Sequence, residues 1–224
     1  MRVTRFLWLL ILCLVAPLGA AEKGTMVISY IDHPKSANYF SLIIKSYNDI
    51  GFRVELVKMP TERRLMALDE GLVDADLIAS ANISKRFDNL VKVHPTIGTA
   101  SLFLLCRVGL KCDLDLLKDE NATIYSGGGA KNAAEELFSP VKAKIKTLEI
   151  ETTLLKMIAL GRIDYLLWPD VKGSLEGEVK LRIQYIEVGQ LSIFHFMHKK
   201  HIEHKPALEK ALARNLKILK EGKE

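Results

Sequence analysis

Four patterns that would each define a function class are missing from this sequence. After the first 21 residues, no apolar run is long enough to cross a membrane. No CxxC pair and no GxSxG segment occurs, which argues against dithiol redox chemistry and against a serine hydrolase. Basic residues are interspersed with acidic ones except near the lysine-rich C-terminus, and no basic stripe alternates with aromatic residues. We therefore expect no nucleic-acid partner.

The composition and the N-terminus indicate a globular, exported protein. Of the 224 residues, 49 % are hydrophobic and 26 % are charged, as in folded domains. Two arginines precede an apolar run from Phe6 to Leu18, and small residues follow as far as Ala21, the pattern of a cleaved secretory signal. We expect residues 1–21 to be removed and the mature protein to act in the periplasm. Cys13 is a poor lipid-anchor site, because Leu12 precedes it where a small residue is needed.

Two cysteines, Cys106 and Cys112, remain after cleavage, with five residues between them. In an oxidising compartment they can close a disulfide loop, which the chain-entropy model values at about 2 kcal/mol for so short a loop. The alternative is a pair of buried thiols without a bond. We favour the disulfide, acting as a structural staple.

Strand-like and helix-like segments alternate along the first half of the mature chain. Apolar and β-branched runs predict strands over Thr25–Ile31, Arg53–Met59 and Val73–Ser80. A helix that carries Tyr39 to Tyr47 should stop near Gly51, and Pro60 opens a second helix that ends at Gly71. The order strand–helix–strand–helix–strand is typical of a mostly parallel sheet with helices on its faces.

The same pattern repeats in the second half, after an extended segment over Thr99–Arg107. The pattern predicts strands over Ala122–Tyr125, Ile145–Ile150 and Asp164–Trp168, and helices over Ala130–Phe138 and Thr152–Leu160. A last strand over Ser192–Met197 and a helix over Pro206–Lys220 have no partners of their own, so they should dock on one of the halves. The chain is therefore predicted to form two α/β lobes with a ligand cleft between them.

Several short phrases then follow one another in a fixed order along the chain. They are Pro60-Thr-Glu-Arg63-Arg-Leu65, Leu68-x-x-Gly71-x-x-Asp74, Ile83-Ser-Lys-Arg86, Ile124-Tyr-Ser-Gly127-Gly-Gly129, Leu160-Gly161-Arg162-Ile163-Asp164 and Leu216-Lys-x-Leu219-Lys-x-x-Gly222. This order resembles that of the family 3 periplasmic solute-binding proteins, which have the type II periplasmic binding protein fold. The resemblance covers nearly the whole mature chain, and it extends to a compact branch with a His-Lys-Lys-His segment, here His198 to His201.

The resemblance implies a fold and a function. Lobe 1 is expected from 22–97 and 190–224, and lobe 2 from 98–189, with two hinge crossings. The implied function is the capture of a small polar, anion-bearing molecule, such as an amino acid or a carboxylate, by closure of the cleft. The ligand would pass to an ABC-type transporter or a membrane sensor. A monomer suits a closing cleft, and no cofactor is implied.

In lobe 1, the resemblance makes Arg86 the residue that pairs with a ligand carboxylate in a bidentate fork. The alternative is an ordinary surface arginine. Arg63 is the other candidate for an anion, or else it forms an ion pair with Glu62 or Glu70. The remaining candidates in this lobe are Tyr30, Asp32, Ser80 and Asn82.

In lobe 2, Ser126, Gly128 and Gly129 lead into a helix N-terminus, where free N–H groups and the helix dipole favour an anion. The alternative is a flexible glycine turn. Amino-acid binders of the family place an aspartate after the strand that Trp168 ends, where it holds the ligand ammonium. This chain has proline at that place and Asp170 one residue later, a departure from the α-amino-acid pattern. Trp168 either stacks on the ligand or packs in the core.

Four histidines recur at every third residue from His195 to His204. Since the first is expected in a strand and the last just before a helix, their rings should scatter rather than converge. The neighbouring Lys199 and Lys200 would also repel a cation. We expect no metal site.

Two further function classes remain open. A few proteins of this fold family are cyclic-acid dehydratases, and Asp32, His33 and Asp170 are the candidates here for a general acid or base. A signalling module that binds a partner without a small ligand is the other. We favour a binding protein without catalytic residues. Saturable binding of a small molecule without product formation would exclude both alternatives.

Overall fold

The computed structural model describes residues 23–31, 37–148, 151–170 and 183–221. The predicted leader, residues 1–21, and the candidates Asp32 and His33 lie outside these ranges. The helices are α1 (Ala37–Asn48), α2 (Thr61–Asp69), α3 (Gly128–Leu137), α4 (Glu151–Ala159) and α5 (Lys205–Glu221), with 3₁₀ turns η1 (Ala81–Lys85), η2 (Leu114–Lys118) and η4 (Lys199–His204). No helix within the described ranges is long and apolar enough to span a membrane.

Eight strands form one sheet in the order β2-β1-β3-β8-β4-β7-β5-β6. Their bounds are β1 (Thr25–Tyr30), β2 (Arg53–Lys58), β3 (Ala75–Ser80), β4 (Leu90–Arg107), β5 (Thr123–Ser126), β6 (Lys144–Thr147), β7 (Tyr165–Asp170) and β8 (Ile183–His198). β1 is parallel to β2 and β3, and β5 is parallel to β6 and β7. The two parallel groups are joined by antiparallel pairing through β8 and β4. Each predicted half is therefore a parallel group at one end of the sheet.

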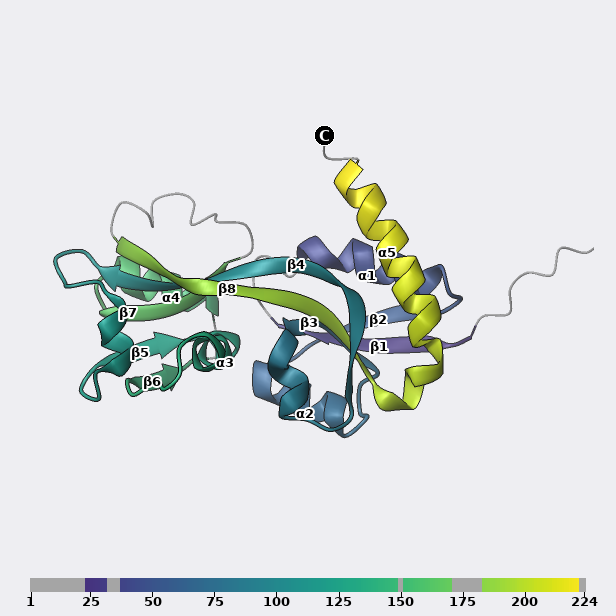
Figure 1. Cartoon of the computed structure of the whole chain (residues 1–224), viewed down its shortest axis with the longest axis horizontal. Coiled ribbons are helices and arrows are strands. Elements are labelled where there is room, and N and C mark those ends of the chain that lie inside the picture. Colours follow the sequence, from purple (N-terminus) through teal and green to yellow (C-terminus); the bar gives the residue numbers. More distant parts are fainter. Residues whose placement is uncertain (1–22, 32–36, 149–150, 171–182, 222–224) are drawn as a thin grey trace, which may run out of the picture.

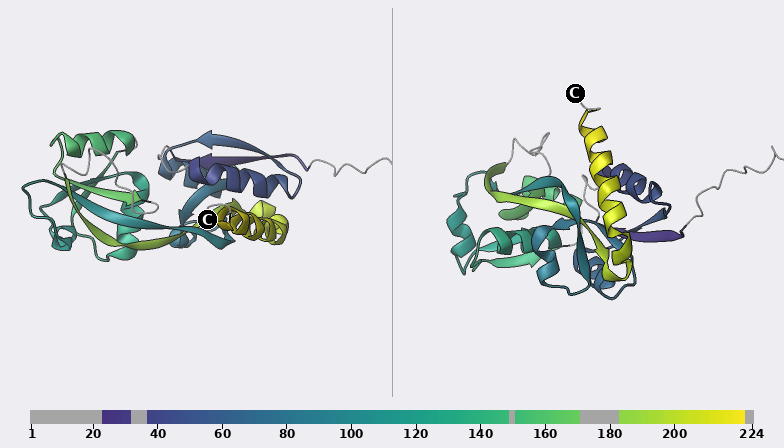
Figure 2. Two further views of the ribbon diagram at one scale, coloured as in Figure 1. Left: turned by 90° about the horizontal axis from the view of Figure 1, so that it is seen from above. Right: turned by 45° about the vertical axis from the view of Figure 1, so that its right-hand side comes forward.

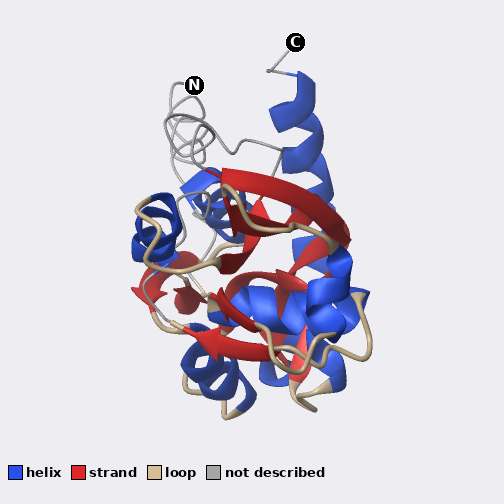
Figure 3. Cartoon of the chain, turned by 90° about the vertical axis from the view of Figure 1, so that its left-hand side faces the viewer, coloured by secondary structure: helices blue, strands red, loops and turns tan. Residues whose placement is uncertain are grey.

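The long strands β4 and β8 run from one half of the molecule to the other (Figure 1). Seen from above, these two strands connect the half with β1–β3 to the half with β5–β7 (Figure 2). Viewed along the long axis, helices (blue) lie around and beside the strands (red) (Figure 3). The predicted α/β architecture with two lobes is confirmed in this arrangement.

Both connecting strands are longer than the sequence predicts. β4 begins at Leu90 rather than Thr99, because Leu90 to Val93 already pair with β8. This pairing is interrupted between Val93 and Gly98 and then resumes. Pro95, which cannot donate to a ladder, lies in that irregular stretch. β8 begins at Ile183 rather than Ser192, and half of its first eight residues are exposed.

Separate apolar cores stabilise the two halves. In the first half, α1 and α5 pack on one face of the sheet and α2 packs on the other. In the second half, α3 and α4 cover opposite faces. Ala100 of β4 and Ile193 of β8 belong to a core of the first half, whereas Leu102 of β4 and Leu191 of β8 belong to a core of the second half. The lobe limits at residues 97/98 and 189/190 remain a prediction.

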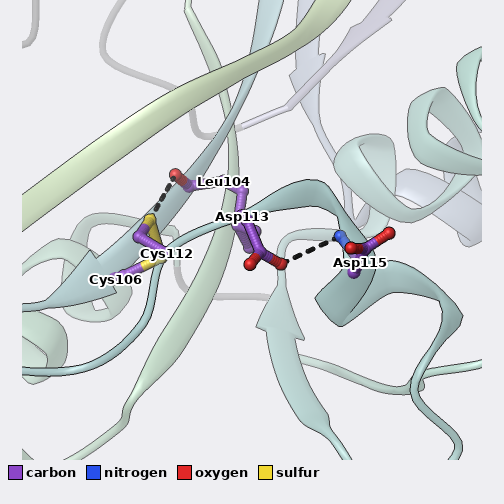
Figure 4. Close-up of a disulfide and its surroundings, with 5 residues drawn as sticks. All are labelled: Leu104, Cys106, Cys112, Asp113 and Asp115. Atoms are coloured by element: carbon purple, nitrogen blue, oxygen red, sulfur yellow. Dashed lines mark hydrogen bonds between the residues drawn. A yellow bond between two sulfur atoms is a disulfide. The ribbon is translucent and has the colours of Figure 1, made fainter.

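A disulfide joins Cys106 at the end of β4 to Cys112 in the following loop (Figure 4). The Cys106 side chain is fully buried, and the Cys112 sulfur lies 3.9 Å from the Leu104 carbonyl oxygen. Asp113 then caps η2, since its carboxylate accepts the Asp115 N–H at 3.0 Å. The bond thus fixes the loop between β4 and η2 against the core of the second half.

Replacing both cysteines by serine is expected to lower the free energy of unfolding by about 2 kcal/mol. The physical reason is the larger conformational freedom of the unfolded chain once the short loop is open. Urea unfolding of wild type and of Cys106→Ser/Cys112→Ser measures the difference. Wild type unfolded in the presence of a reducing agent should match the double variant, and an unchanged midpoint in both would contradict the prediction.

Candidate functional site

Four of the predicted ligand contacts are the last residues of four strands. Tyr30 ends β1, Ser80 ends β3, Ser126 ends β5 and Asp170 ends β7. In open α/β sheets, ligands bind beyond the carboxyl ends of the parallel strands. These four side chains therefore mark the edges of the two parallel groups where such a site belongs.

Two of them are buried and carry an oxygen that lacks a protein partner. Ser126 is 0 % and Asp170 is 2 % exposed. Within the described residues, Ser126 Oγ and Asp170 Oδ2 make no hydrogen bond. A buried polar atom left unbonded costs about 1–3 kcal/mol. A ligand donor that reaches these oxygens would recover that energy.

Strand pairing places Asp170 near the crossing between the halves. Ser101 of β4 lies opposite Asp170 on one side and Gln190 of β8 on the other. Three residues earlier in β4, Gly98 pairs with Ile193, which in turn pairs with Ser80. The two rows are about 10 Å apart along β4. Because an odd number of steps separates them, Ser80 and Asp170 lie on opposite faces of the local ladder.

Tyr39 of α1 is a residue at this crossing that the sequence pattern assigned only to an apolar helix face. A Cβ placed on Gly98 would lie 3.1 Å from the Tyr39 hydroxyl, so the phenol packs against the β4 backbone. Burial raises the pKa of Tyr39 to about 12, and the hydroxyl therefore stays protonated at neutral pH. A protonated hydroxyl here is a neutral hydrogen-bond donor beside the connecting strands.

The buried arginine of α2 is Arg64, the neighbour of the candidate ligand residue Arg63. Arg63 is exposed, whereas Arg64 is 4 % exposed and forms an ion pair with Asp76 of β3. Arg64 also donates to the Ile78 carbonyl oxygen at 3.4 Å, and the Ser29 hydroxyl donates to Asp76 at 3.1 Å. Burial raises the pKa of Asp76, and the Arg64 guanidinium opposes that rise.

Sequence reasoning missed this cluster because it followed the Pro-x-x-Arg-x-Leu phrase to Arg63 and did not consider the adjacent Arg64. The helical phase of α2 decides which of them faces the sheet, since Leu65 and Leu68 of the same face are buried. The cluster ties α2 to β1 and β3, the two strands that end at Tyr30 and Ser80.

The other predicted anion-binding residue, Arg86, follows η1 and is exposed, with its guanidinium 5.4 Å from the Phe87 ring centre. Its Nη2 donates to Glu62 at 3.2 Å. Arg86 thus takes the ion pair with Glu62 that was one alternative for Arg63. Asn82, within η1, is half-buried.

The glycine turn of the second half contacts α2 of the first. Helix α3 starts at Gly128, and a Cβ added there would lie 2.8 Å from Thr61 Cβ at the start of α2. Gly129 has open space around its Cβ position. The first turns of α2 and α3 therefore meet, and Gly128 allows this close approach because it has no side chain.

The predicted stacking residue Trp168 lies within the core. It is 4 % exposed and packs with Phe103 and Leu166 in the second half. Trp168 and Asp170 share a face of β7, since they are two residues apart. The indole is therefore a neighbour of the buried carboxylate rather than an exposed platform.

The four histidines have different partners, although the rings of His201 and His204 are stacked with their centroids 6.3 Å apart. His195 is fully buried and its Nε2 lies 2.9 Å from the Tyr47 hydroxyl. His198 Nδ1 accepts the Lys200 N–H, His201 contacts Asp74 at 2.7 Å, and the His204 ring packs edge-on to Phe52. In the parts of the chain that the structure describes, no three His, Cys, Asp or Glu residues are grouped to hold a metal ion.

Solved structures with the same architecture cover most of the chain at low sequence identity. AbpA, an amino acid ABC transporter substrate-binding protein from Streptococcus pneumoniae bound to L-arginine, is 18 % identical over 90 % of this chain and 91 % of its own, with a TM-score of 0.63. The ancestral amino acid-binding protein AncCDT-1, a precursor of cyclohexadienyl dehydratase, is 18 % identical over 85 % and 89 %, with a TM-score of 0.65. The VFT2 domain of Bordetella pertussis BvgS is 15 % identical over 84 % and 87 %, with a TM-score of 0.60.

These likenesses show that the chain has the two-lobed fold of the type II periplasmic binding proteins, as the ordered sequence phrases implied. No protein-family model matches the sequence, and the comparison with curated proteins gives no match.

Proposed function

We propose that this protein is a periplasmic solute-binding protein that captures a small polar molecule bearing a carboxylate or similar anion. The observation that carries the proposal is that the buried oxygens Ser126 Oγ and Asp170 Oδ2, at strand ends of a binding-protein fold, have no hydrogen-bond partner among the described residues and can accept from donor groups of a polar solute. Arg86 supplies the cation for the ligand anion, and the start of α3 adds free N–H groups.

Capture by this fold uses movement of the halves about the connecting strands. Among the strands that the structure describes, β4 and β8 run between the halves (Figure 2), and Gly98 lies where their pairing resumes after its interruption. The ligand would then pass to an ABC-type transporter or a membrane sensor, and the protein would act as an exported monomer. The neighbours support this class, since AbpA serves an amino acid ABC transporter.

An enzyme on this fold is the second candidate, because the buried Asp170 carboxylate has an oxygen without a hydrogen-bond partner among the described residues and AncCDT-1 is a precursor of cyclohexadienyl dehydratase. The same titration separates the two candidates. Saturable heat or fluorescence change without a new product supports binding alone, and product formation detected by mass spectrometry supports turnover.

The first test is calorimetric titration of refolded, ligand-free protein with amino acids, small carboxylates, sugars and cyclic acids. The fluorescence of Trp168, which lies beside Asp170, gives a second readout.

For the solute that binds, Asp170→Asn is expected to weaken binding about 10- to 100-fold, since a hydrogen bond to a charged group contributes about 1.5–3 kcal/mol. Asp164→Asn is the matched control, because Asp164 lies just before β7 and its side chain is 52 % exposed.

No response to any solute would contradict the proposal and favour a module that binds a partner protein. If Asp170→Asn and Asp164→Asn weaken solute binding equally, Asp170 does not contact the ligand.

A further inference from the structure

One carboxylate in the structure contacts both halves. Glu62, in the first turn of α2, accepts a hydrogen bond from Arg86 through Oε2 at 3.2 Å. Its other oxygen, Oε1, accepts from Asn132 Nδ2 of α3 at 3.4 Å. Thr61 and Gly128 touch directly beside this contact. Glu62 therefore lies where the two halves meet and is already bound to the arginine expected to receive the ligand anion.

The ion pair between Glu62 and Arg86 is exposed enough to exchange partners. The side chain of Arg86 is 46 % exposed and that of Glu62 is 52 % exposed. Exposed ion pairs of this kind contribute about 0–1 kcal/mol, because water screens them and both side chains lose freedom when paired. A ligand carboxylate can thus replace Glu62 on Arg86 at little cost.

We propose that Glu62 determines which charge pattern the site accepts: it holds Arg86 when no ligand is bound and pairs with the cationic group of a ligand whose carboxylate replaces it. This inference rests on the proposed function. A simple carboxylate breaks the Glu62–Arg86 pair and forms one new pair with Arg86. A zwitterion with adjacent ammonium and carboxylate breaks the same pair and forms two. Glu62 therefore favours zwitterions and competes with simple carboxylates.

Asp170 does not replace Glu62 in this role. Asp170 is buried at the end of β7, whereas Glu62 is the carboxylate bonded directly to Arg86. A cation next to the carboxylate that Arg86 holds would meet Glu62 first. Amino-acid binders of the family carry an aspartate at the position of Pro169. In this chain, Glu62 would supply the carboxylate that Pro169 lacks.

The test compares Glu62→Gln with Glu70→Gln, a control at the exposed C-terminal end of the same helix. Calorimetry measures the affinities of two pairs of probes, L-leucine with 4-methylpentanoate and L-glutamate with glutarate. Loss of the Glu62 charge should weaken the amino acids about 2- to 5-fold and tighten their deaminated partners by a similar factor, as expected for an exposed pair. Glu70→Gln should change neither. A shift of both probe classes in the same direction, or no shift, would overturn the proposal.

A ligand-free measurement separates the failure of this inference from the failure of the proposed function. Spin labels on Lys45→Cys in α1 and Lys156→Cys in α4 report the distance between the halves. Glu62→Ala should broaden that distance distribution, because alanine removes the oxygen that accepts the hydrogen bond from Asn132, and Glu70→Ala should leave it unchanged. If no probe binds to wild type, the proposed function fails, and a broadened distribution still supports the contact through Glu62. An unchanged distribution would overturn the role of Glu62.

Discussion

Replacing Arg64 by methionine is expected to lower the free energy of unfolding by about 3–5 kcal/mol, because it leaves the buried Asp76 carboxylate without its cation. Asp76 is 0 % exposed, and the Ser29 hydroxyl is then its remaining side-chain partner among the described residues. Urea unfolding at pH 7 measures the loss. Arg63→Met is a closely matched control, since Arg63 is the exposed neighbour on the same helix and should change stability by no more than about 0.5 kcal/mol.

The cause of the loss can be checked by a second substitution. Adding Asp76→Leu to Arg64→Met should recover much of the stability, because no buried charge then remains. Equal stability of the Arg64 and Arg63 variants would contradict the prediction. So would a double variant that is less stable than Arg64→Met alone.

The destabilisation by Arg64→Met should also depend on pH. Burial already raises the pKa of Asp76 in wild type, and removal of the Arg64 guanidinium, which opposes that rise, raises it further. A group with a raised folded pKa binds more protons in the folded state, so its contribution to stability falls as pH rises. The stability difference between wild type and the variant should therefore be smaller at pH 5 than at pH 7.

Wild-type stability is expected to fall by about 3 kcal/mol between pH 6.5 and pH 4 because of one histidine. His195 is fully buried among Tyr47, Leu77 and Asp76, and this burial lowers its pKa from 6.5 to about 4. The unfolded chain protonates this ring below pH 6.5, while the folded chain does not until about pH 4. The stabilisation is therefore complete above pH 6.5 and is lost as pH falls, at about 1.4 kcal/mol per pH unit.

Comparison of wild type with His195→Gln isolates this effect. The lowered pKa values of Asp49, Asp74 and Glu209 act mainly below the window, since these carboxylates titrate near pH 4 when unfolded. Chemical unfolding at several pH values should give a shallower pH dependence for the variant. The same slope in both proteins would show that His195 is not the group responsible.

The sequence predicted most elements because each one has a strong local signal. Pro60 precedes α2, and Gly51 and Gly71 follow α1 and α2 with positive φ angles of 92° and 73°, a conformation that glycine adopts without strain. The predicted strands differ from those observed mostly by one or two residues at their ends. The lengths of β4 and β8 were underestimated, because Pro95 interrupts the one pattern and Gly189 and Gln190 interrupt the other, while the pairing itself comes from non-local partners.

The sequence alone determined the order of elements, the two-lobed fold and the placement of Tyr30, Ser80, Ser126 and Asp170 at strand ends, because these follow from local periodicity and from ordered phrases. Only the tertiary structure decided which arginine is buried, that Glu62 is bonded to Arg86, and that Trp168 lies in the core. Those outcomes depend on helix phase and on contacts between distant segments. The local sequence pattern does not tell which of the adjacent Arg63 and Arg64 faces the sheet. It also does not tell which carboxylate from another element pairs with a given arginine.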